Sequence, residues 1–338
     1  MAEAARQEFA NPSVAGDAPL IAADVGGTYA RIGLVNIGSG APQVSTFERY
    51  RCSDFSDLSS IFQRFLGDHG SDGHARARRG AIAIAGYVLD DAIINNNLPW
   101  RVSLSQIRRA LDLDDLQVIN DFTAIAYATN SVAARDVTPI AATSAPLEGP
   151  VLVVGPGTGL GAAVRIPTAR STVILSTEAG QSALTASTDL EIEILRMLLR
   201  DTTHVPVEHV LSGPGLANLY AVLGTLRGMQ ARSLTPREIA ESAIDGSDAL
   251  AVEALHVFCG WLGSVVGNLV LVYGAQGGVH LAGGILPQIT DFLLRSDFAA
   301  RFRDKGQMRD VLERVPVHLI EHGQLGVIGA AQWYLEQQ

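Results

Sequence analysis

The stretch "IAADVGGTYARIGLV", residues Ile21–Val35, indicates the fold class by placing a glycine pair between two apolar runs. This pattern predicts a strand, a tight turn and a second strand. Glycines in such a turn allow close approach of the backbone to a ligand and can point N–H groups at an anion. Thr28 adds a hydroxyl and Arg31 a guanidinium. The stretch is therefore either a phosphate-binding hairpin or a plain tight hairpin with an exposed arginine.

A second stretch of the same kind, "GPVLVVGPGTGLGAAVRIP", runs from Gly149 to Pro167. Its Gly157-Thr158 pair follows Gly27-Thr28 by 130 positions (157 minus 27), which suggests two related halves. The segment also fits the G-x-G-x-x-A pattern of dinucleotide-binding folds. That fingerprint must open a helix, whereas "AAVRIP" continues as a strand, so a nicotinamide-dependent oxidoreductase ranks third among the functions considered.

The segments around the two hairpins alternate between strand and helix patterns. "DLSSIFQRFLGDH" has apolar residues at helical spacing, "GAIAIAGYV" reads as a short buried strand ended by glycine, and the strand "LQVIN" runs into the helical "DFTAIAYATN". This alternation predicts an α/β fold. Beyond the second hairpin the patterns are mostly helical, so we expect the second half to be larger and more helical.

Length and composition narrow the class of protein. A chain of 338 residues exceeds the size at which one core usually stops growing, which predicts two domains. The net charge of −10 argues against a nucleic-acid partner. Two cysteines, Cys52 and Cys259, are too few for a disulfide framework or a cysteine-rich zinc site, so we expect a cytoplasmic protein without a structural metal. The first residues lack the apolar core of a signal peptide and are expected to form a flexible extension.

One segment is long and apolar enough to suggest a membrane span. Between Ala254 and Thr290 there is no Asp, Glu, Lys or Arg. Glycines, Asn268 and Pro287 interrupt the apolar run. We therefore predict a buried helix followed by a buried strand and a loop, and no membrane partner.

Candidate catalytic and binding residues follow the strands. Asn120 and Asp121 end an apolar strand, where ligands collect in α/β sheets. Asp121 could act as a base toward a hydroxyl or could cap the following helix, and spacing alone favours the cap. Glu178 and Gln181 in "STEAGQSALTAS", and Glu208 in "VPVEHVLSGPG", suit hydrogen bonds to sugar hydroxyls, although each could equally be a solvated loop residue.

In their order along the chain, these motifs resemble the bacterial ATP-dependent glucokinase family, within the hexokinase and actin-like ATPase superfamily. "DVGGTYAR", "NNLPW" with "INDFTAIA", "GPGTGLG", "TEAGQ", "EHVLSGPGLANLY" and "GGVHLAGGILP" follow the family order. The resemblance runs from about Leu20 to about Gln332.

The resemblance implies a two-domain actin-like ATPase (ribonuclease H-like) fold around a central cleft, with ATP on one side and a hexose on the other. We expect an extension over residues 1–18, a small α/β domain over 19–120 and a large α/β domain over 121–324. A helix at about 325–338 would pack back on the small domain. The implied enzyme is an ATP:hexose 6-phosphotransferase, most simply a glucokinase.

The resemblance also implies residue roles. Asp121 would take the proton of the sugar 6-hydroxyl, and Asp24 would organise Mg²⁺ with the phosphates. Further side chains would bind the sugar: Asn97, Asn120, Glu178, Gln181 and Glu208. Three groups would contact the nucleotide: Gly26, Gly27, Thr28 and Arg31; Gly157, Thr158 and Gly159; and Gly283 with Gly284.

The chain departs from the family pattern at several positions. Tyr29 stands where Asn is usual, Tyr87 where Pro follows the "AIA" strand, and Ala179 where the sugar loop has a second glycine. Gln181 replaces the usual sugar-binding His, and "SALTAS" replaces Asp-Phe-Ala-Pro. The alternative to a working glucokinase is therefore a sugar or nucleotide-binding homologue with altered specificity or weak transfer. Family analogy further suggests a homodimer.

Overall fold

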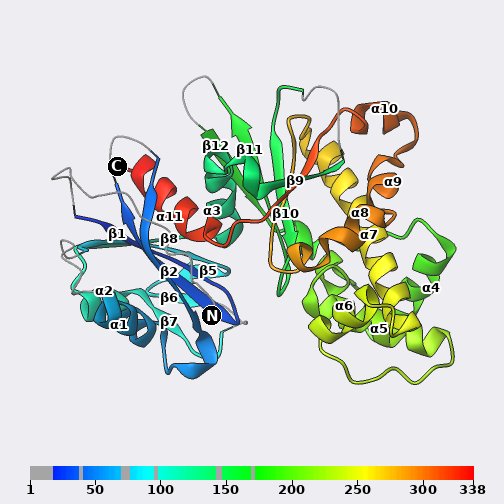
Figure 1. Cartoon of the computed structure of the whole chain (residues 1–338), viewed down its shortest axis with the longest axis horizontal. Helices are drawn as coiled ribbons and strands as arrows, with labels where there is room; N and C mark the ends of the chain where they lie inside the picture. The colour runs from blue at the N-terminus through cyan, green and yellow to red at the C-terminus, as the bar shows by residue number, and fades with distance from the viewer. Residues whose placement is uncertain (1–17, 38–40, 70–76, 95–97, 142–146, 169–171) are drawn as a thin grey trace, which may run out of the picture.

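The computed structural model describes residues 18–37, 41–69, 77–94, 98–141, 147–168 and 172–338. Figure 1 shows two lobes that lie side by side, each built on its own sheet. We call the first sheet with helices α1 and α2 the N-terminal lobe, and the second sheet with helices α4 to α10 the C-terminal lobe. Two helices, α3 (Asp121–Ala128) and α11 (Leu325–Glu336), lie between the sheets.

The first sheet has the strand order β3-β2-β1-β4-β8. The β1–β2 and β2–β3 pairs are antiparallel, and β4 and β8 join in parallel. The strands are β1 (Leu20–Val25), β2 (Tyr29–Asn36), β3 (Gln43–Arg51), β4 (Arg79–Ile84) and β8 (Asp115–Ile119). Helices α1 (Leu58–His69) and α2 (Leu104–Leu111) pack their apolar side chains on one face of the sheet.

The short buried strand predicted in "GAIAIAGYV" is present and ends before a glycine, but it is shorter than this stretch. β4 ends at Ile84 and a separate strand begins at Tyr87, because Gly86 adopts a φ of 115° that ends the extended run. The new strand belongs to a small antiparallel sheet of β5 (Tyr87–Leu89), β6 (Ala92–Ile94) and β7 (Val102–Ser103).

The second sheet repeats the plan of the first, in the order β12-β11-β10-β13-β14-β9. Its β10–β11 hairpin corresponds to β1–β2, and β13 joins β10 in parallel as β4 joins β1. The strands are β9 (Val137–Ala141), β10 (Val151–Pro156), β11 (Leu160–Pro167), β12 (Thr172–Thr177), β13 (Gly278–Leu281) and β14 (Val317–Ile320). The recurrence of the glycine-threonine pair therefore does mark two halves of similar topology.

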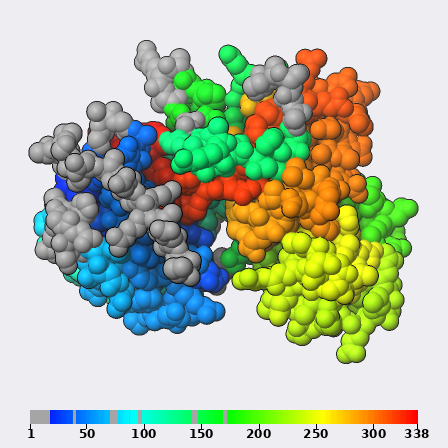
Figure 2. All heavy atoms as spheres, in the orientation of Figure 1, coloured from blue at the N-terminus to red at the C-terminus, as the bar shows by residue number. Residues whose placement is uncertain are grey.

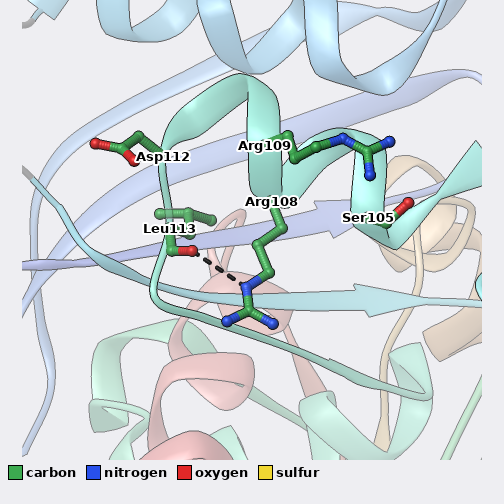
Figure 3. Close-up of a pocket in the computed structure, with 5 residues that line it drawn as sticks. All are labelled: Ser105, Arg108, Arg109, Asp112 and Leu113. Carbon is green, nitrogen blue, oxygen red and sulfur yellow. Dashed lines mark hydrogen bonds between the residues drawn. The ribbon is translucent and has the colours of Figure 1, made fainter.

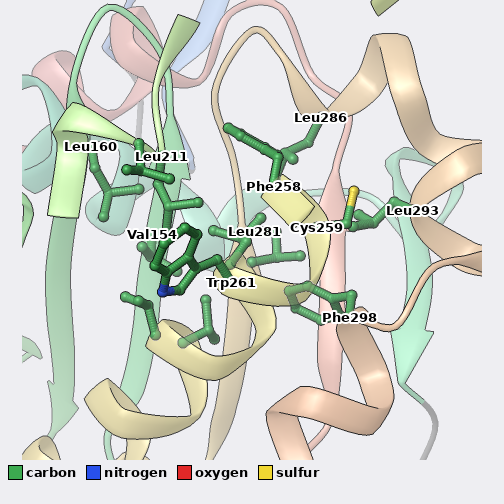
Figure 4. Close-up of a cluster of buried hydrophobic side chains, with 14 of the residues drawn as sticks. Val154, Leu160, Leu211, Phe258, Cys259, Trp261, Leu281, Leu286, Leu293 and Phe298 are labelled. Atoms are coloured by element: carbon green, nitrogen blue, oxygen red, sulfur yellow. The ribbon is translucent and has the colours of Figure 1, made fainter. Parts of the chain in front are cut away.

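The apolar segment forms the core of the C-terminal lobe. Helix α7 (Ala249–Tyr273) begins at the cap Asp248 and is followed by β13, as predicted. It is long and apolar enough to cross a membrane by composition, but 72% of its most apolar window is buried within the fold. Its Trp261 is fully buried in the apolar cluster of Figure 4. The indole N–H of Trp261 donates to the carbonyl of Thr185 at 2.7 Å. Burial of this kind explains the charge-free stretch as a core helix.

The remaining helices surround α7 and complete the C-terminal lobe. They are α4 (Asp189–Leu198), α5 (Gly213–Leu226), α6 (Pro236–Ile244), α8 (Thr290–Arg295), α9 (Phe298–Arg303) and α10 (Arg309–Leu312). Thr188 and Thr235 each form a capping box with a glutamate three residues on, which fixes where α4 and α6 begin.

Helix α3 packs against both sheets. Ala124 and Tyr127 join a cluster with the first sheet and α11, whereas Phe122 and Ala126 pack on the second sheet. Because α3 is shared in this way, a domain boundary immediately before it stays a prediction. Helix α11 packs on the first sheet although it follows the second in sequence.

Candidate active site

The two glycine turns occupy equivalent places at the ends of their hairpins. In the first, Gly26 N–H donates to the carbonyl of Tyr29 at 3.0 Å, and Cys52 N–H donates to Thr28 at 2.9 Å. In the second, Gly157 N–H donates to Gly159 at 2.7 Å. These bonds close each turn on itself, so the turn geometry does not depend on a ligand.

The second turn is packed closely by neighbouring groups. A Cβ on Gly161 would lie 1.9 Å from the ring of Phe122, and one on Gly159 would lie 2.5 Å from Oε2 of Glu208. Gly213 N–H, at the start of α5, donates to the carbonyl of Gly157 at 2.8 Å. Gly159 and Gly161 therefore have to be glycines, because any side chain there would overlap these neighbouring groups.

Asp121 is the first residue of α3 and does not cap it. Asn120 is the cap, since its Oδ1 accepts from Thr123 N–H at 3.0 Å. Spacing alone had favoured Asp121 for this role, and that interpretation was wrong by one residue. One oxygen of Asp121 accepts from Phe122 N–H at 2.9 Å, while the cap commits the oxygen of Asn120 and leaves its NH₂ group as the one that could face a ligand.

Two carboxylates lie within electrostatic reach of Asp121 at the start of α3. Burial first, and then the negative charges of Asp24 and Glu178, raise the pKa of Asp121 to about 6, against the hydrogen bond from Phe122 N–H. Burial also raises the pKa of Asp24, against the effect of Arg31, whose Nη1 lies 3.1 Å from its Oδ2. A carboxylate with a pKa near neutrality, buried next to like charges, is typical of a catalytic base.

Helix α11 leaves room for Asp24. A Cβ on Gly326, in the first turn of α11, would lie 2.5 Å from the carboxyl carbon of Asp24. No local pattern indicates this contact, because the two residues are 302 positions apart (326 minus 24).

Glu208 joins the sugar-loop candidates to the second turn. Its Oε1 accepts from Nε2 of Gln181 at 2.7 Å, and its Oε2 accepts from Leu160 N–H at 3.2 Å. Gln181 lies in the 3₁₀ turn Ala179–Gln181, and its carbonyl contacts Nε2 of His204 at 3.0 Å. Gln181 is thus a built-in partner of Glu208, and His204 is a contact that motif reasoning missed.

Gly283 lies next to the second turn, at the carboxyl end of β13. Its φ is 96°, and a Cβ there would lie 2.6 Å from the carbonyl oxygen of Pro156. Gly284 faces open space, with nothing within 4 Å of a built Cβ. The two glycines are therefore brought to the same edge of the sheet as Gly157.

A depression of about 170 Å³ opens between the second turn and α5. It is lined by Thr158, Pro206, Glu208, His209, Ser212, Pro214, Gly215 and Asn218. Figure 2 shows that the surface is also hollowed between the two lobes. The candidate residues of the second turn thus border an accessible space.

A larger depression, of about 440 Å³, lies at α2, away from these residues (Figure 3). Arg108 in its wall donates to the carbonyls of Leu113, at 3.2 Å, and Asp114. Helix α2 covers the face of the first sheet that carries Ala23, whereas Asp24 points to the opposite face. We do not include this depression in the site.

Asn97, which the sequence places among the sugar-binding candidates, lies outside the described residues. Sequence reasoning missed Phe122, which docks α3 on Gly161, and the contact between the hydroxyls of Thr123 and Ser176 at 2.7 Å. The neighbouring Asp121 drew attention to this segment, but nothing in the spacing identified its partners.

Comparisons with known proteins agree with this geometry. The family profile described as Glucokinase matches residues 21–337. A glucokinase-like protein of Xylella fastidiosa (strain 9a5c) is 45% identical over 97% of this chain and 99% of its own length. A glucokinase of Saccharophagus degradans is 37% identical over 93% of this chain and 98% of its own length.

Solved structures have the same architecture. A glucokinase from an Antarctic psychrotroph superposes with a TM-score of 0.81 at 35% identity, covering 95% of this chain and 100% of that one. A ROK family glucokinase from Streptomyces griseus, in complex with glucose and AMPPNP, gives a TM-score of 0.61 at 19% identity, covering 93% and 98%. The second likeness concerns the fold alone.

The paired sheets with a glycine turn at the tip of each hairpin define the actin-like ATPase fold, as the resemblance implied. Within that class the chain belongs to the glucokinase family, and it is a sugar kinase.

Proposed function

We propose that this protein transfers the terminal phosphoryl group of ATP to the 6-hydroxyl of a hexose, most simply glucose. The observation that carries the proposal is Asp121, a buried carboxylate with a pKa of about 6. A base of this pKa is ionised at neutral pH yet still takes up a proton readily.

In the proposed reaction, Asp121 accepts the proton of the sugar hydroxyl while the hydroxyl oxygen forms a bond to the terminal phosphorus. The bond from that phosphorus to the bridging oxygen breaks, and ADP leaves with the electron pair. Such transfer depends mainly on positioning and on neutralising charge. The relatives named glucokinase, and the AMPPNP bound in a structure of the same fold, support ATP and glucose as substrates.

We propose that Asn120, Glu178, Gln181 and Glu208 hold the sugar, with Asn97 as a further contact. Glu208 and Gln181 already bond to each other at 2.7 Å. The pair can accept hydrogen bonds through the remaining lone pairs of the carboxylate and the amide oxygen, so it suits sugar hydroxyls.

We propose that the phosphates lie between the first turn, with Gly26, Gly27 and Thr28, and the second turn, with Gly157, Thr158 and Gly159. Arg31 would act through its pair with Asp24, and Gly283 with Gly284 would border the adenosine.

The residues at the first turn fit a magnesium ion. Asp24 supplies carboxylate oxygens, the donors that Mg²⁺ prefers. Burial raises the pKa of Asp24, and its charge raises the pKa of Asp121, so a cation beside Asp24 would relieve both effects. When bound, Mg²⁺ would neutralise phosphate charge. Asp24 would hold it there while also orienting Arg31.

An altered sugar specificity is the second candidate. One reason is Gln181, which stands where the family usually has a sugar-binding His. A second reason is that the relative at 45% identity is named only glucokinase-like. A site that pairs a particular hydroxyl discriminates by about 10⁴-fold against a sugar lacking it, so one changed side chain can redirect the enzyme.

A coupled assay of ADP release tests both candidates. The purified protein would be given ATP and Mg²⁺ with glucose, mannose, fructose, N-acetylglucosamine or no sugar. The proposal expects release that depends on hexose and is fastest with glucose. A faster rate with another hexose supports altered specificity, and hexose binding by calorimetry without any release would reject the kinase proposal.

The cytoplasmic location, the homodimer and the domain limits 19–120 and 121–324 stay proposals. Both cysteines are free and buried, which suits a reducing compartment.

A further inference from the structure

The region between the two turns carries more negative than positive charge. Asp24 and Glu178 both lie within electrostatic reach of Asp121. Arg31 is already paired with Asp24 at 3.1 Å. A nucleotide would add several negative phosphate charges, and like charges at close range destabilise binding. Cationic side chains, in addition to the magnesium ion proposed at Asp24, would therefore stabilise a polyphosphate bound here.

Arg49 stands beside the first turn. It pairs with Arg31 across β2 and β3, and Arg31 pairs with Asp24 across β1 and β2. Side chains paired in register share a face of the sheet, so Arg49 lies on the face of Asp24. Its guanidinium carbon is 4.6 Å from the ring centre of Tyr29, a cation–π contact. Tyr29 itself closes the first turn through its carbonyl.

Arg237 stands beside the second turn, in the opposite lobe. It is the second residue of α6, whose Pro236 lies near Gly213: a Cβ built there would be 3.9 Å from Cβ of Pro236 and 3.4 Å from the carbonyl of Gly157. The side chain of Arg237 is 79% exposed and pairs with Glu241 at 2.7 Å.

Tyr29 lies near both arginines. The hydrogen bond and the charge of Glu241 raise the pKa of Arg237 most, and Tyr29 would raise it slightly if its phenol were ionised, so the two side chains lie within electrostatic reach. Figure 1 shows the tip of the β1–β2 hairpin pointing toward α6. Tyr29, which stands where the family usually has Asn, thus lies near both Arg49 and Arg237.

Resting on the proposed kinase function, we propose that Arg49 and Arg237 are nucleotide-binding residues that neutralise the phosphate chain of a nucleoside di- or triphosphate from opposite lobes. Tyr29 is a positioning residue, because its ring holds Arg49 beside the first turn. The ligand class is a polyphosphate nucleotide, because an uncharged nucleoside would gain nothing from either cation.

Calorimetric titration with ADP and Mg²⁺ tests the proposal without relying on turnover. Arg49→Gln and Arg237→Gln should each weaken ADP binding by about 10-fold, the usual size of a lost charge-assisted hydrogen bond. Adenosine should bind as to the wild type. Arg309→Gln is the matched control, since Arg309 forms the same kind of exposed pair with Glu313, at 3.0 Å, on the distant helix α10.

Two more variants separate charge from positioning. Tyr29→Phe keeps the ring and should bind ADP nearly as the wild type does, whereas Tyr29→Leu should lose as much affinity as Arg49→Gln. Glu241→Gln frees Arg237 from its partner and should tighten ADP binding by about twofold.

Unchanged ADP affinity in both arginine variants would overturn the proposal, as would an equal loss in the Arg309 control. Wild-type protein that binds no ADP rejects it together with the proposed function. If wild-type protein phosphorylates a hexose while both variants bind ADP normally, only this inference fails. If no hexose is phosphorylated yet ADP binding depends on both arginines, only the kinase proposal fails.

Discussion

The β1–β2 and β10–β11 hairpins share a pattern and a topology but differ in how their glycines are used. A Cβ on Gly26 in the first turn would meet only the carbonyl of Tyr29, at an ordinary 3.6 Å. In the second hairpin, a Cβ on Gly155 would lie 2.0 Å from the carbonyl oxygen of Ala282, and one on Gly161 would lie 1.9 Å from Phe122. Gly26 at the tip of the first hairpin has room around it, whereas Gly155 and Gly161 of the second hairpin are held by close packing. One sequence pattern therefore supports two physical roles.

The largest expected effect is at Asp121, which begins the helix between the two hairpins. Asp121→Asn keeps the size of the side chain but cannot take up a proton, so turnover should fall by at least about 100-fold while sugar and ADP still bind. Coupled ADP release gives the turnover and calorimetry the binding. Normal turnover would mean that another group is the base.

The packing difference can be broken at single glycines. Gly161→Ala forces a methyl group into Phe122 and should lower the free energy of unfolding by about 1–3 kcal/mol. Gly157→Ala is the matched control, because nothing lies within 4 Å of its built Cβ, and it should change stability by less than about 0.5 kcal/mol. Urea denaturation measures both. Equal losses would show that the second hairpin is not held by close packing.

The sugar loop depends on the second hairpin through Glu208. Gln181→Leu removes the donor to Oε1 of Glu208 and should raise the KM for the hexose by about 10-fold, with the KM for ATP nearly unchanged. Initial rates at varied sugar and at varied ATP separate the two constants. A rise in the KM for ATP alone would contradict a role in sugar binding.

The negative charges around Asp121 should be visible in the pH dependence of kcat/KM. Asp121 must be ionised to act, so kcat/KM should rise as the pH increases through about 6 and level off above. Glu178→Gln removes one neighbouring negative charge, so the rising limb should move to lower pH by less than about one unit. Rates from pH 5 to 8 test this. A limb that stays in place would mean that Glu178 does not act on Asp121.

The raised pKa of Asp121 also predicts how the stability of the fold depends on pH. The folded-state pKa of Asp121 is above its usual value of 3.8, so the folded protein loses stability as the pH rises from about 4 through about 6. Asp121→Asn should remove that loss and raise the free energy of unfolding at pH 7 by at most about 3 kcal/mol. Denaturation of both proteins at pH 4 and pH 7 provides the comparison.

Much of the fold was readable from the sequence because its signals are local. Apolar runs around a glycine turn define each hairpin, and a charge-free stretch with a helical pattern defines α7. The small sheet beginning at Tyr87 was not readable, because it depends on the backbone angle of one glycine, Gly86. The cap of α3 was misplaced by one residue, since Asn and Asp are equally good caps.

The candidate site was readable only residue by residue. Resemblance pointed to Asp121 and Glu208, but their partners come from distant segments. Leu160 is 48 positions from Glu208 (208 minus 160), and Arg49 reaches the first turn only through the pairing of β2 with β3. Contacts of this kind arise from tertiary packing, which a single sequence does not encode in its spacing.

Helix α3 has a mechanical consequence. Its apolar side chains are shared between the two sheets, and a Cβ on Gly329 of α11 would lie 1.7 Å from the carbonyl of Ala124, so the two helices cannot separate without losing close contact. We therefore expect any rotation of one lobe against the other to have its axis near α3. Atoms close to a rotation axis move least, and atoms far from it move most. Asp121, at the start of α3, would stay almost still, and the parts of each lobe far from α3 would move most.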